Sequence, residues 1–189
     1  MGRWEPDSRG RLQEAALSLY SERGFDQTTV AQIAARAGLT ERTFFRLFSD
    51  KREVLFGGSA LLSERIVAGV AGAPKSNGAL DAVARGLDAA AAMLGEFRRD
   101  LASQRQAVIA ANPELREREL AKLGDYATAV AAALHERGVA EPQATLAAEA
   151  GMTVLRLAIQ QWVGKHEERD LAEIMRDSVA ELRDLTASG

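Results

Sequence analysis

Hydrophobic residues recur along this chain at the spacing of a helix. In the first such segment, residues 8–23, they occupy positions i, i+3, i+4, i+7 and i+8, which lie on one helical face. These positions are Leu12, Ala15, Ala16, Leu19 and Tyr20. The same reasoning predicts further helices at about 30–37, 40–47, 51–71, 79–96, 98–111, 113–137, 142–163 and 171–185. Alanine is abundant while β-branched and aromatic residues are sparse, so the pattern predicts an all-α fold.

Glycine and proline mark where these helices end. Gly24 follows the first helix as its C-terminal glycine, and Gly38 is expected at positive φ in a tight turn. The pair Gly57-Gly58 falls inside the helix expected at 51–71, where each glycine costs about 0.5–1 kcal/mol relative to alanine. We therefore expect a weak or bent point there. Residues 69–79 form the clearest break in the chain.

Composition and charge narrow the class of protein. The 189 residues suffice for one or two domains with a sizeable core. There is no cysteine, and the N-terminus has no apolar stretch like that of a signal peptide. We find no run of about 18 apolar residues, so we expect a soluble cytoplasmic protein that does not span a membrane.

The charge is distributed unevenly along the chain. Residues 1–56 contain nine Lys or Arg and eight Asp or Glu, a net charge of +1, whereas residues 57–189 contain fifteen and nineteen, a net charge of −4. The total of −3 therefore hides a mildly basic N-terminal part. This weak asymmetry fits DNA binding directed to particular sites.

Residues 25–55 contain the most informative motif. A short helix at 30–37 is followed by a turn at Gly38-Leu39 and a second short helix after Thr40. This arrangement is a helix-turn-helix, which places its second helix in the major groove of DNA.

At these residues the chain resembles the tetracycline-repressor (TetR) family of transcriptional regulators. The resemblance covers roughly residues 8–56 and rests on many positions in register, from Gly24-Phe25 through Thr28-Thr29 and Ala37-Gly38 to the segment 51–55. It implies an all-α homodimer with a helix-turn-helix DNA-binding domain at 1–56. It also implies a C-terminal helical bundle at 57–189 for ligand binding and dimerisation. The chain departs from the family at Phe45, where a tyrosine is usual, so a phosphate bond from that hydroxyl is lost.

Eight polar or exposed residues are candidates for contact with DNA. They are Thr29, Thr40, Glu41, Arg42, Thr43, Phe45, Arg46 and Lys51. Arg42 is the best candidate for reading a base, because guanidinium pairs with guanine O6 and N7, and Glu41 can accept from cytosine N4. Thr43 and Thr29 are expected at phosphates, and the resemblance implies the same role for Lys51. The alternatives are solvated surface charges, a simple N-cap at Thr29 and a surface lysine.

The C-terminal helices suggest two further sites. The first is a ligand pocket, for which the candidate residues are Met93, Phe97, Gln104, Val108, Tyr126, Arg156 and Trp162. The second is half of a four-helix dimer interface, for which the candidates are Met152, Leu155, Ile159, Trp162, Ile174, Met175, Val179 and Leu182. The alternatives are ordinary core and surface for the first set and intramolecular core for the second.

Enzyme chemistry finds little support. His135 and His166 are the only histidines, and neither has a metal-ligand partner at helical spacing. No glycine-rich nucleotide loop is present, and we predict no catalytic residue, metal or cofactor. The expected function is a ligand-responsive repressor that binds a near-palindromic double-stranded operator as a homodimer. In this reading a small-molecule effector shifts the helix at 51–71 like a lever. The alternatives are a helical adaptor without sequence-specific DNA binding and, less favoured, a small helical enzyme.

Overall fold

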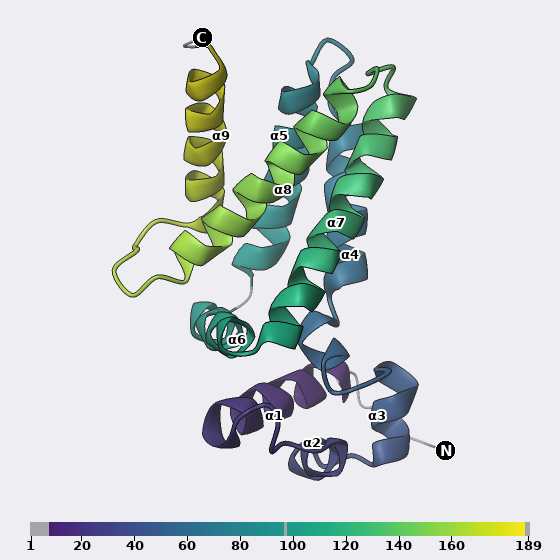
Figure 1. Cartoon of the computed structure of the whole chain (residues 1–189), viewed down its shortest axis with the longest axis vertical. Coiled ribbons are helices and arrows are strands. Elements are labelled where there is room, and N and C mark those ends of the chain that lie inside the picture. Colours follow the sequence, from purple (N-terminus) through teal and green to yellow (C-terminus); the bar gives the residue numbers. More distant parts are fainter. Residues whose placement is uncertain (1–7, 97, 188–189) are drawn as a thin grey trace. The chain divides into compact units, whose positions relative to one another are not determined.

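The protein consists of helices joined by turns and loops (Figure 1). The computed structural model describes residues 8–96 and 98–187. Within these residues there are nine α-helices, one 3-10 helix and no strand, which confirms the all-α prediction. The elements are α1 Ser8–Arg23, α2 Val30–Arg36, α3 Glu41–Leu47, η1 Glu53–Phe56, α4 Ser59–Ala71, α5 Ala79–Gly95, α6 Arg99–Ala111, α7 Pro113–Glu136, α8 Gln143–Trp162 and α9 Leu171–Ala187.

These helices form two compact units. The first contains the chain up to Gly58 together with Leu101–Glu119, and the second contains Ser59–Asp100 and the chain from Leu120 onward. By packing, most of α6 and the start of α7 thus belong with the N-terminal helices. The sequence placed this segment in the domain 57–189.

The first unit is built around the apolar stripe of α1. Leu12 and Phe44 are fully buried, and the apolar residues of α2, α3 and η1 complete the core around them. Val108 and Ile109 of α6 and Leu115 of α7 lie in the same cluster. These later helices therefore help to hold the N-terminal helices in place.

The helix expected at 51–71 is divided in two. Residues 53–56 form the 3-10 helix, a turn follows at Gly57-Gly58, and α4 begins only at Ser59. A Cβ atom at Gly57 would lie 2.7 Å from the ring of Phe48, so glycine is required there by close packing. The expected weak point is thus an interruption, and the predicted continuous helix was wrong.

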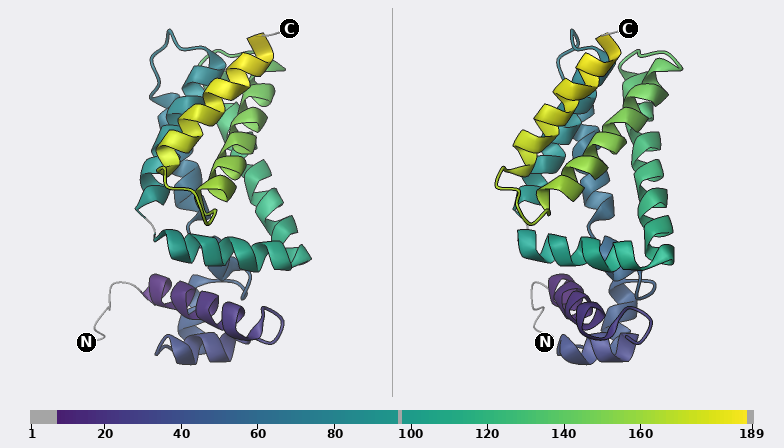
Figure 2. Two further views of the ribbon diagram at one scale, coloured as in Figure 1. Left: turned by 90° about the vertical axis from the view of Figure 1, so that its left-hand side faces the viewer. Right: turned by 60° about the vertical axis from the view of Figure 1, so that its left-hand side comes forward.

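In the second unit, close helix packing depends on small residues. α4 and α5 approach each other where Gly86 faces the backbone of Ile66, and a Cβ atom there would lie 2.8 Å from the Ile66 carbonyl oxygen. α9 packs against both α5 and α8, as the views in Figure 2 show. The residues of α9 that face these helices, Leu171, Ile174, Met175 and Val179, are buried.

The stretch Glu53–Ala71 has the length and composition of a membrane-spanning segment, with a mean hydropathy of 1.4. Its continuous α-helix, α4, contains only 13 residues. At 1.5 Å per residue this helix is about 20 Å long, whereas a bilayer core is about 30 Å thick. The continuous helix within this stretch is therefore shorter than a bilayer core is thick.

Candidate nucleic-acid interface

The helix α3 has one buried and one exposed face. Phe44 is fully buried and packs edge-on against Phe45, whose own side chain is 56% exposed. Glu41, Arg42 and Arg46 are also exposed. The helical repeat puts consecutive positions on different faces, so two adjacent phenylalanines have opposite roles. The exposed face combines a carboxylate, two guanidinium groups and an aromatic ring.

The start of α3 is fixed by two threonines. The Thr40 hydroxyl accepts a hydrogen bond of 3.2 Å from the backbone N–H of Thr43, and the two hydroxyl oxygens lie 3.1 Å apart. Thr40 is exposed and Thr43 half-buried. Thr40 is therefore the N-cap of α3, a role that holds the first turn in a defined orientation.

The charged groups on the exposed face of α3 are available for another molecule. Among the described residues, no hydrogen-bond or ion-pair partner is found for the side chains of Glu41, Arg42 or Arg46. Arg36 on α2 differs, since its guanidinium pairs with Glu22 at 3.0 Å. The unpaired guanidinium groups of α3 are thus the donors best suited to bases or phosphates.

Thr29 forms a capping box at the start of α2. Its hydroxyl accepts from the N–H of Gln32 at 3.2 Å, and the Gln32 side chain accepts from the N–H of Thr29 at 3.0 Å. The side chain of Thr29 is exposed. The N-cap reading is confirmed, and contact with a phosphate stays a prediction.

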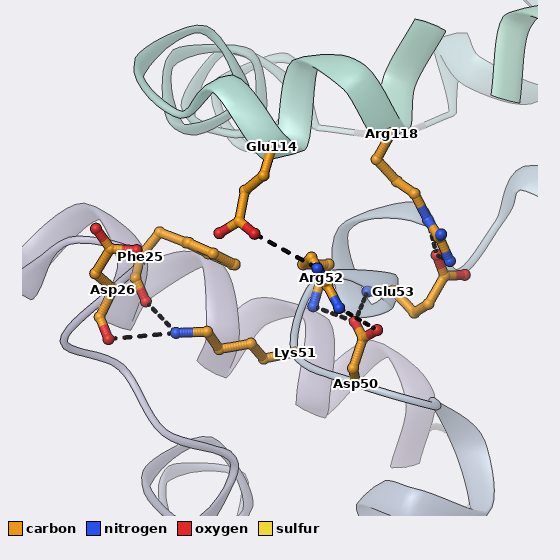
Figure 3. Close-up of polar contacts among 8 residues, drawn as sticks. All are labelled: Phe25, Asp26, Asp50, Lys51, Arg52, Glu53, Glu114 and Arg118. Atoms are coloured by element: carbon orange, nitrogen blue, oxygen red, sulfur yellow. Dashed lines mark hydrogen bonds and ion pairs between the residues drawn. The ribbon is translucent and has the colours of Figure 1, made fainter. Parts of the chain in front are cut away.

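Lys51 lies in a different setting from the one the sequence suggested. Its ammonium nitrogen donates to the carbonyl oxygens of Phe25 at 2.8 Å, Thr28 at 3.1 Å and Asp26 at 3.3 Å. It also lies 4.3 Å from the centroid of the Phe25 ring. These contacts bind the half-buried Lys51 to the loop between α1 and α2, and Figure 3 shows those to Phe25 and Asp26. They weaken the prediction that Lys51 contacts a phosphate.

Sequence reasoning missed the residues that hold this region together. Arg105 donates to the carbonyl oxygen of Leu55 at 2.8 Å, Arg118 donates to Glu53 at 2.6 Å, and Arg52 pairs with Glu114 at 3.5 Å. All of these contacts lie within the first unit. No local pattern could have revealed them, because each partner lies at least 50 residues away in the chain.

The residues predicted for the ligand pocket are divided between the two compact units. Gln104 and Val108 belong to the first unit, where Val108 is part of the core, while Met93, Tyr126, Arg156 and Trp162 belong to the second. Phe97 lies outside the described residues. Trp162 is buried, and the guanidinium carbon of Arg99 lies 5.3 Å from the centroid of its ring. The ligand pocket stays a prediction.

The surface of the described residues has grooves but no cluster of metal-binding side chains. Two shallow grooves occur on the described surface, one along α1 and α2 and one along α8 and α9, and neither contains a residue predicted for the pocket. Within residues 8–96 and 98–187, no three His, Asp or Glu side chains gather to hold a metal ion.

Most residues predicted for the dimer interface are buried within one chain. Six are at most 7% exposed, namely Met152, Leu155, Trp162, Ile174, Met175 and Val179. Ile159 and Leu182 are half-buried. The burial of these six residues agrees with the alternative of an intramolecular core, because α9 packs on α5 and on α8. The apolar side chains that remain exposed on α8 are different ones, Leu146 and Leu157.

A capped helix-turn-helix whose second helix exposes Arg42 and Arg46 is typical of DNA-binding regulators. The family model described as bacterial regulatory proteins of the tetR family matches residues 12–56. A second model, the MftR C-terminal domain, matches residues 77–187. The chain belongs to the TetR family of transcriptional regulators.

Individual relatives agree with this assignment. The transcriptional regulator TcmR of Streptomyces glaucescens is 34% identical over 91 residues, which are 48% of this chain and 39% of TcmR. The alignment thus spans about two-fifths of that relative. The structure is similar to FadR of Bacillus subtilis in complex with stearoyl-CoA, with a TM-score of 0.63, 21% identity, and 92% of this chain and 96% of that chain covered.

A third similar protein is FadR of Thermus thermophilus in complex with lauroyl-CoA. Its TM-score is 0.55 and its identity 24%, with 93% of each chain covered. At these identities the structural likeness establishes the fold. DNA binding and regulation of transcription follow from family membership, and the matching family consists of regulators rather than enzymes.

Proposed function

We propose that this protein is a ligand-responsive repressor that binds a near-palindromic operator as a homodimer in the cytoplasm. The observation that carries the proposal is the exposed face of α3, where Arg42 and Arg46 are free of partners among the described residues. Arg42 pairs with guanine in the major groove, and Phe45 packs against a thymine methyl group or a sugar. Two such helices in one dimer read half-sites about 34–36 Å apart.

Exposed leucines on α8 support a revised location for the dimer interface. Leu146 is 66% exposed and Leu157 is 48% exposed. They are eleven residues apart, about three helical turns, so they lie on one face of α8. Thr153, also exposed, lies between them on the same face. A second copy of the chain would bury this face by twofold symmetry.

The effector is a small molecule that binds the second unit and favours a conformation with low affinity for DNA. The two similar FadR proteins bind stearoyl-CoA and lauroyl-CoA. Acyl-CoA compounds are therefore the first class of ligand to test here. The turn at Gly57-Gly58, which interrupts the chain before α4, is where we expect the backbone to flex.

A mobility-shift experiment tests the proposal. Purified protein is mixed with a pool of random duplexes, bound DNA is recovered and sequenced, and the selected duplex is titrated with lauroyl-CoA and stearoyl-CoA. We expect an inverted repeat to be enriched, and release of the duplex by one of these ligands. The repressor proposal is wrong if no sequence is enriched, and the acyl-CoA class is wrong if neither compound changes the affinity.

A further inference from the structure

Lys51 is surrounded by acceptors from a single loop. The loop between α1 and α2 turns three backbone carbonyls, those of Phe25, Asp26 and Thr28, toward the ammonium group. An ammonium group has three N–H donors and no acceptor. The three distances of 2.8, 3.3 and 3.1 Å therefore account for all of its donors. A phosphate oxygen would have to displace one of these carbonyls.

The loop that Lys51 holds leads directly into α2. Thr28 is 1% exposed, its hydroxyl donates to the carbonyl of Gly24 at 2.9 Å, and its N–H donates to the carbonyl of Phe25 at 3.2 Å. The next residue, Thr29, is the exposed N-cap of α2. The Phe25 carbonyl thus accepts from both Thr28 and Lys51. Loss of the ammonium would leave this turn with a single hydrogen bond to that oxygen and loosen the approach to Thr29.

Hydrogen bonds also hold the backbone at Lys51. The hydroxyl of buried Tyr20 donates to the Lys51 carbonyl oxygen at 2.5 Å. The carboxylate of Asp50 accepts from the N–H groups of Arg52 at 2.7 Å and Glu53 at 3.1 Å. The backbone at Lys51 and at the two residues after it is therefore anchored, and Figure 3 shows the contacts of Asp50.

One charged side chain near Lys51, that of Asp26, disfavours a phosphate. The Asp26 side chain is exposed on the same loop and has the sign of a phosphate. Near the surface, a carboxylate and a phosphate repel each other.

We propose that Lys51 is a positioning residue for DNA binding, which fixes the α1–α2 loop and thereby Thr29 at the start of α2, instead of contacting the DNA backbone itself. The inference rests on the proposed function in that Thr29 is expected at a phosphate. The family resemblance suggested instead that Lys51 contacts a phosphate.

The salt dependence of operator binding distinguishes the two roles. Each phosphate neutralised by a cation adds about 0.9 to the slope of log affinity against log salt concentration. Lys51→Met is compared with the wild type and with Arg46→Met, which removes a partner-free guanidinium of α3, on the selected duplex between about 50 and 200 mM salt. For Lys51→Met we expect an affinity about tenfold lower with the slope unchanged, since hydrogen bonds to a charged group are lost. A slope reduced by about 0.9 would overturn the proposal.

Hydrogen exchange in the absence of DNA gives a second, independent measurement. The Thr28 amide should exchange faster in Lys51→Met than in the wild type, while the Phe48 amide, which donates to Phe44 at the end of α3, should be unchanged. An unchanged rate at Thr28 contradicts the proposal even if no duplex is ever selected. A wild-type protein that binds no duplex would instead contradict the proposed function.

A second variant covers the case in which Lys51→Met does not fold. Lys51→Arg keeps the charge but replaces the compact ammonium with a planar guanidinium, which cannot reproduce three converging bonds to the loop. The proposal predicts faster exchange at Thr28 and weaker operator binding for this variant. Wild-type values of both quantities would show that charge alone is needed, as a phosphate contact requires.

Discussion

Arg118 in α7 donates from Nε to the carboxylate of Glu53 in the 3-10 helix at 2.6 Å (Figure 3). The two residues are 65 positions apart in the chain but lie in the same compact unit. Beside them, Arg52, the residue before the 3-10 helix, pairs with Glu114 of α7 at 3.5 Å. α7 is therefore connected to the 3-10 helix and to its N-cap residue. The DNA-binding helices are therefore stabilised by a segment that comes long after them in the sequence.

Removing Arg118 should destabilise the first unit. The Glu53 side chain is only 18% exposed, so in Arg118→Met its carboxylate loses a partner in a partly desolvated position. We expect the free energy of unfolding to fall by about 1–2 kcal/mol, because Arg118 itself is partly exposed and the pair is partly screened. Urea denaturation measures the change. Arg116→Met, at an exposed position of the same helix, should stay within about 0.5 kcal/mol of the wild type, and equal losses in the two variants would contradict the assigned role of Arg118.

Gly86 should not tolerate alanine. A Cβ atom there would lie 2.8 Å from the Ile66 carbonyl oxygen and 2.9 Å from a methyl carbon of Val70. Alanine usually stabilises a helix by about 0.5–1 kcal/mol relative to glycine, but overpacking costs about 1–3 kcal/mol and outweighs that gain. Gly86→Ala is thus expected to lower the thermal midpoint. In Gly124→Ala nothing lies within 4 Å of the added carbon, so the midpoint should rise, and a rise in both would show that α4 and α5 can separate.

Stability should depend on the ionisation of Glu22 in acid. Hydrogen bonds from Arg36 and Ser18 lower the pKa of Glu22 from its ordinary value of 4.5 to about 2. A pKa lowered by folding stabilises the protein above the ordinary pKa, and this contribution is lost as the pH falls from about 4.5 to about 2. The difference in thermal midpoint between the wild type and Glu22→Gln should therefore shrink over that range. Glu14→Gln, on the same helix, controls for the loss of a charge, and a difference that stays constant with pH would rule out this role for Glu22.

The exposed leucines of α8 should determine the oligomeric state. Leu157→Glu places a charge on the proposed twofold interface, so we expect monomers in sedimentation velocity. Leu61→Glu on α4 is a matched control, because Leu61 is 47% exposed and Leu157 is 48% exposed. Dimers in both variants would move the interface elsewhere. Trp162→Asp would not be a clean test of the interface, because Trp162 is buried within the chain and its replacement would disturb the fold.

The sequence predicted well what depends on local periodicity. The 3.6-residue repeat correctly separated buried Phe44 from exposed Phe45, and glycine chemistry located the turn at Gly38, where φ is +65°. Val108 was predicted to line a ligand pocket. The apolar pattern of a helix does not show which other helices cover it, so the place of Val108 in the N-terminal core was missed.

Two other features could not be predicted from the pattern of side chains. The acceptors of Lys51 are backbone carbonyls, whose directions depend on the loop conformation and not on residue type. The apolar residues of α8 and α9 looked like an interface because sequence does not distinguish a neighbour in the same chain from one in another. The structure shows that α5 and α9 provide the cover for α8.

The most direct test of the central claim is selection from random duplexes, carried out in parallel with the wild type and Arg42→Ala. If the exposed face of α3 reads bases, the wild type enriches an inverted repeat with half-sites about 34–36 Å apart. Arg42→Ala then loses the preference at one base pair in each half-site, at a cost of about 1–3 kcal/mol in affinity for the selected duplex. Identical enriched sequences for the two proteins, or uniform weakening on all sequences, would show that Arg42 does not read a base and would contradict the account.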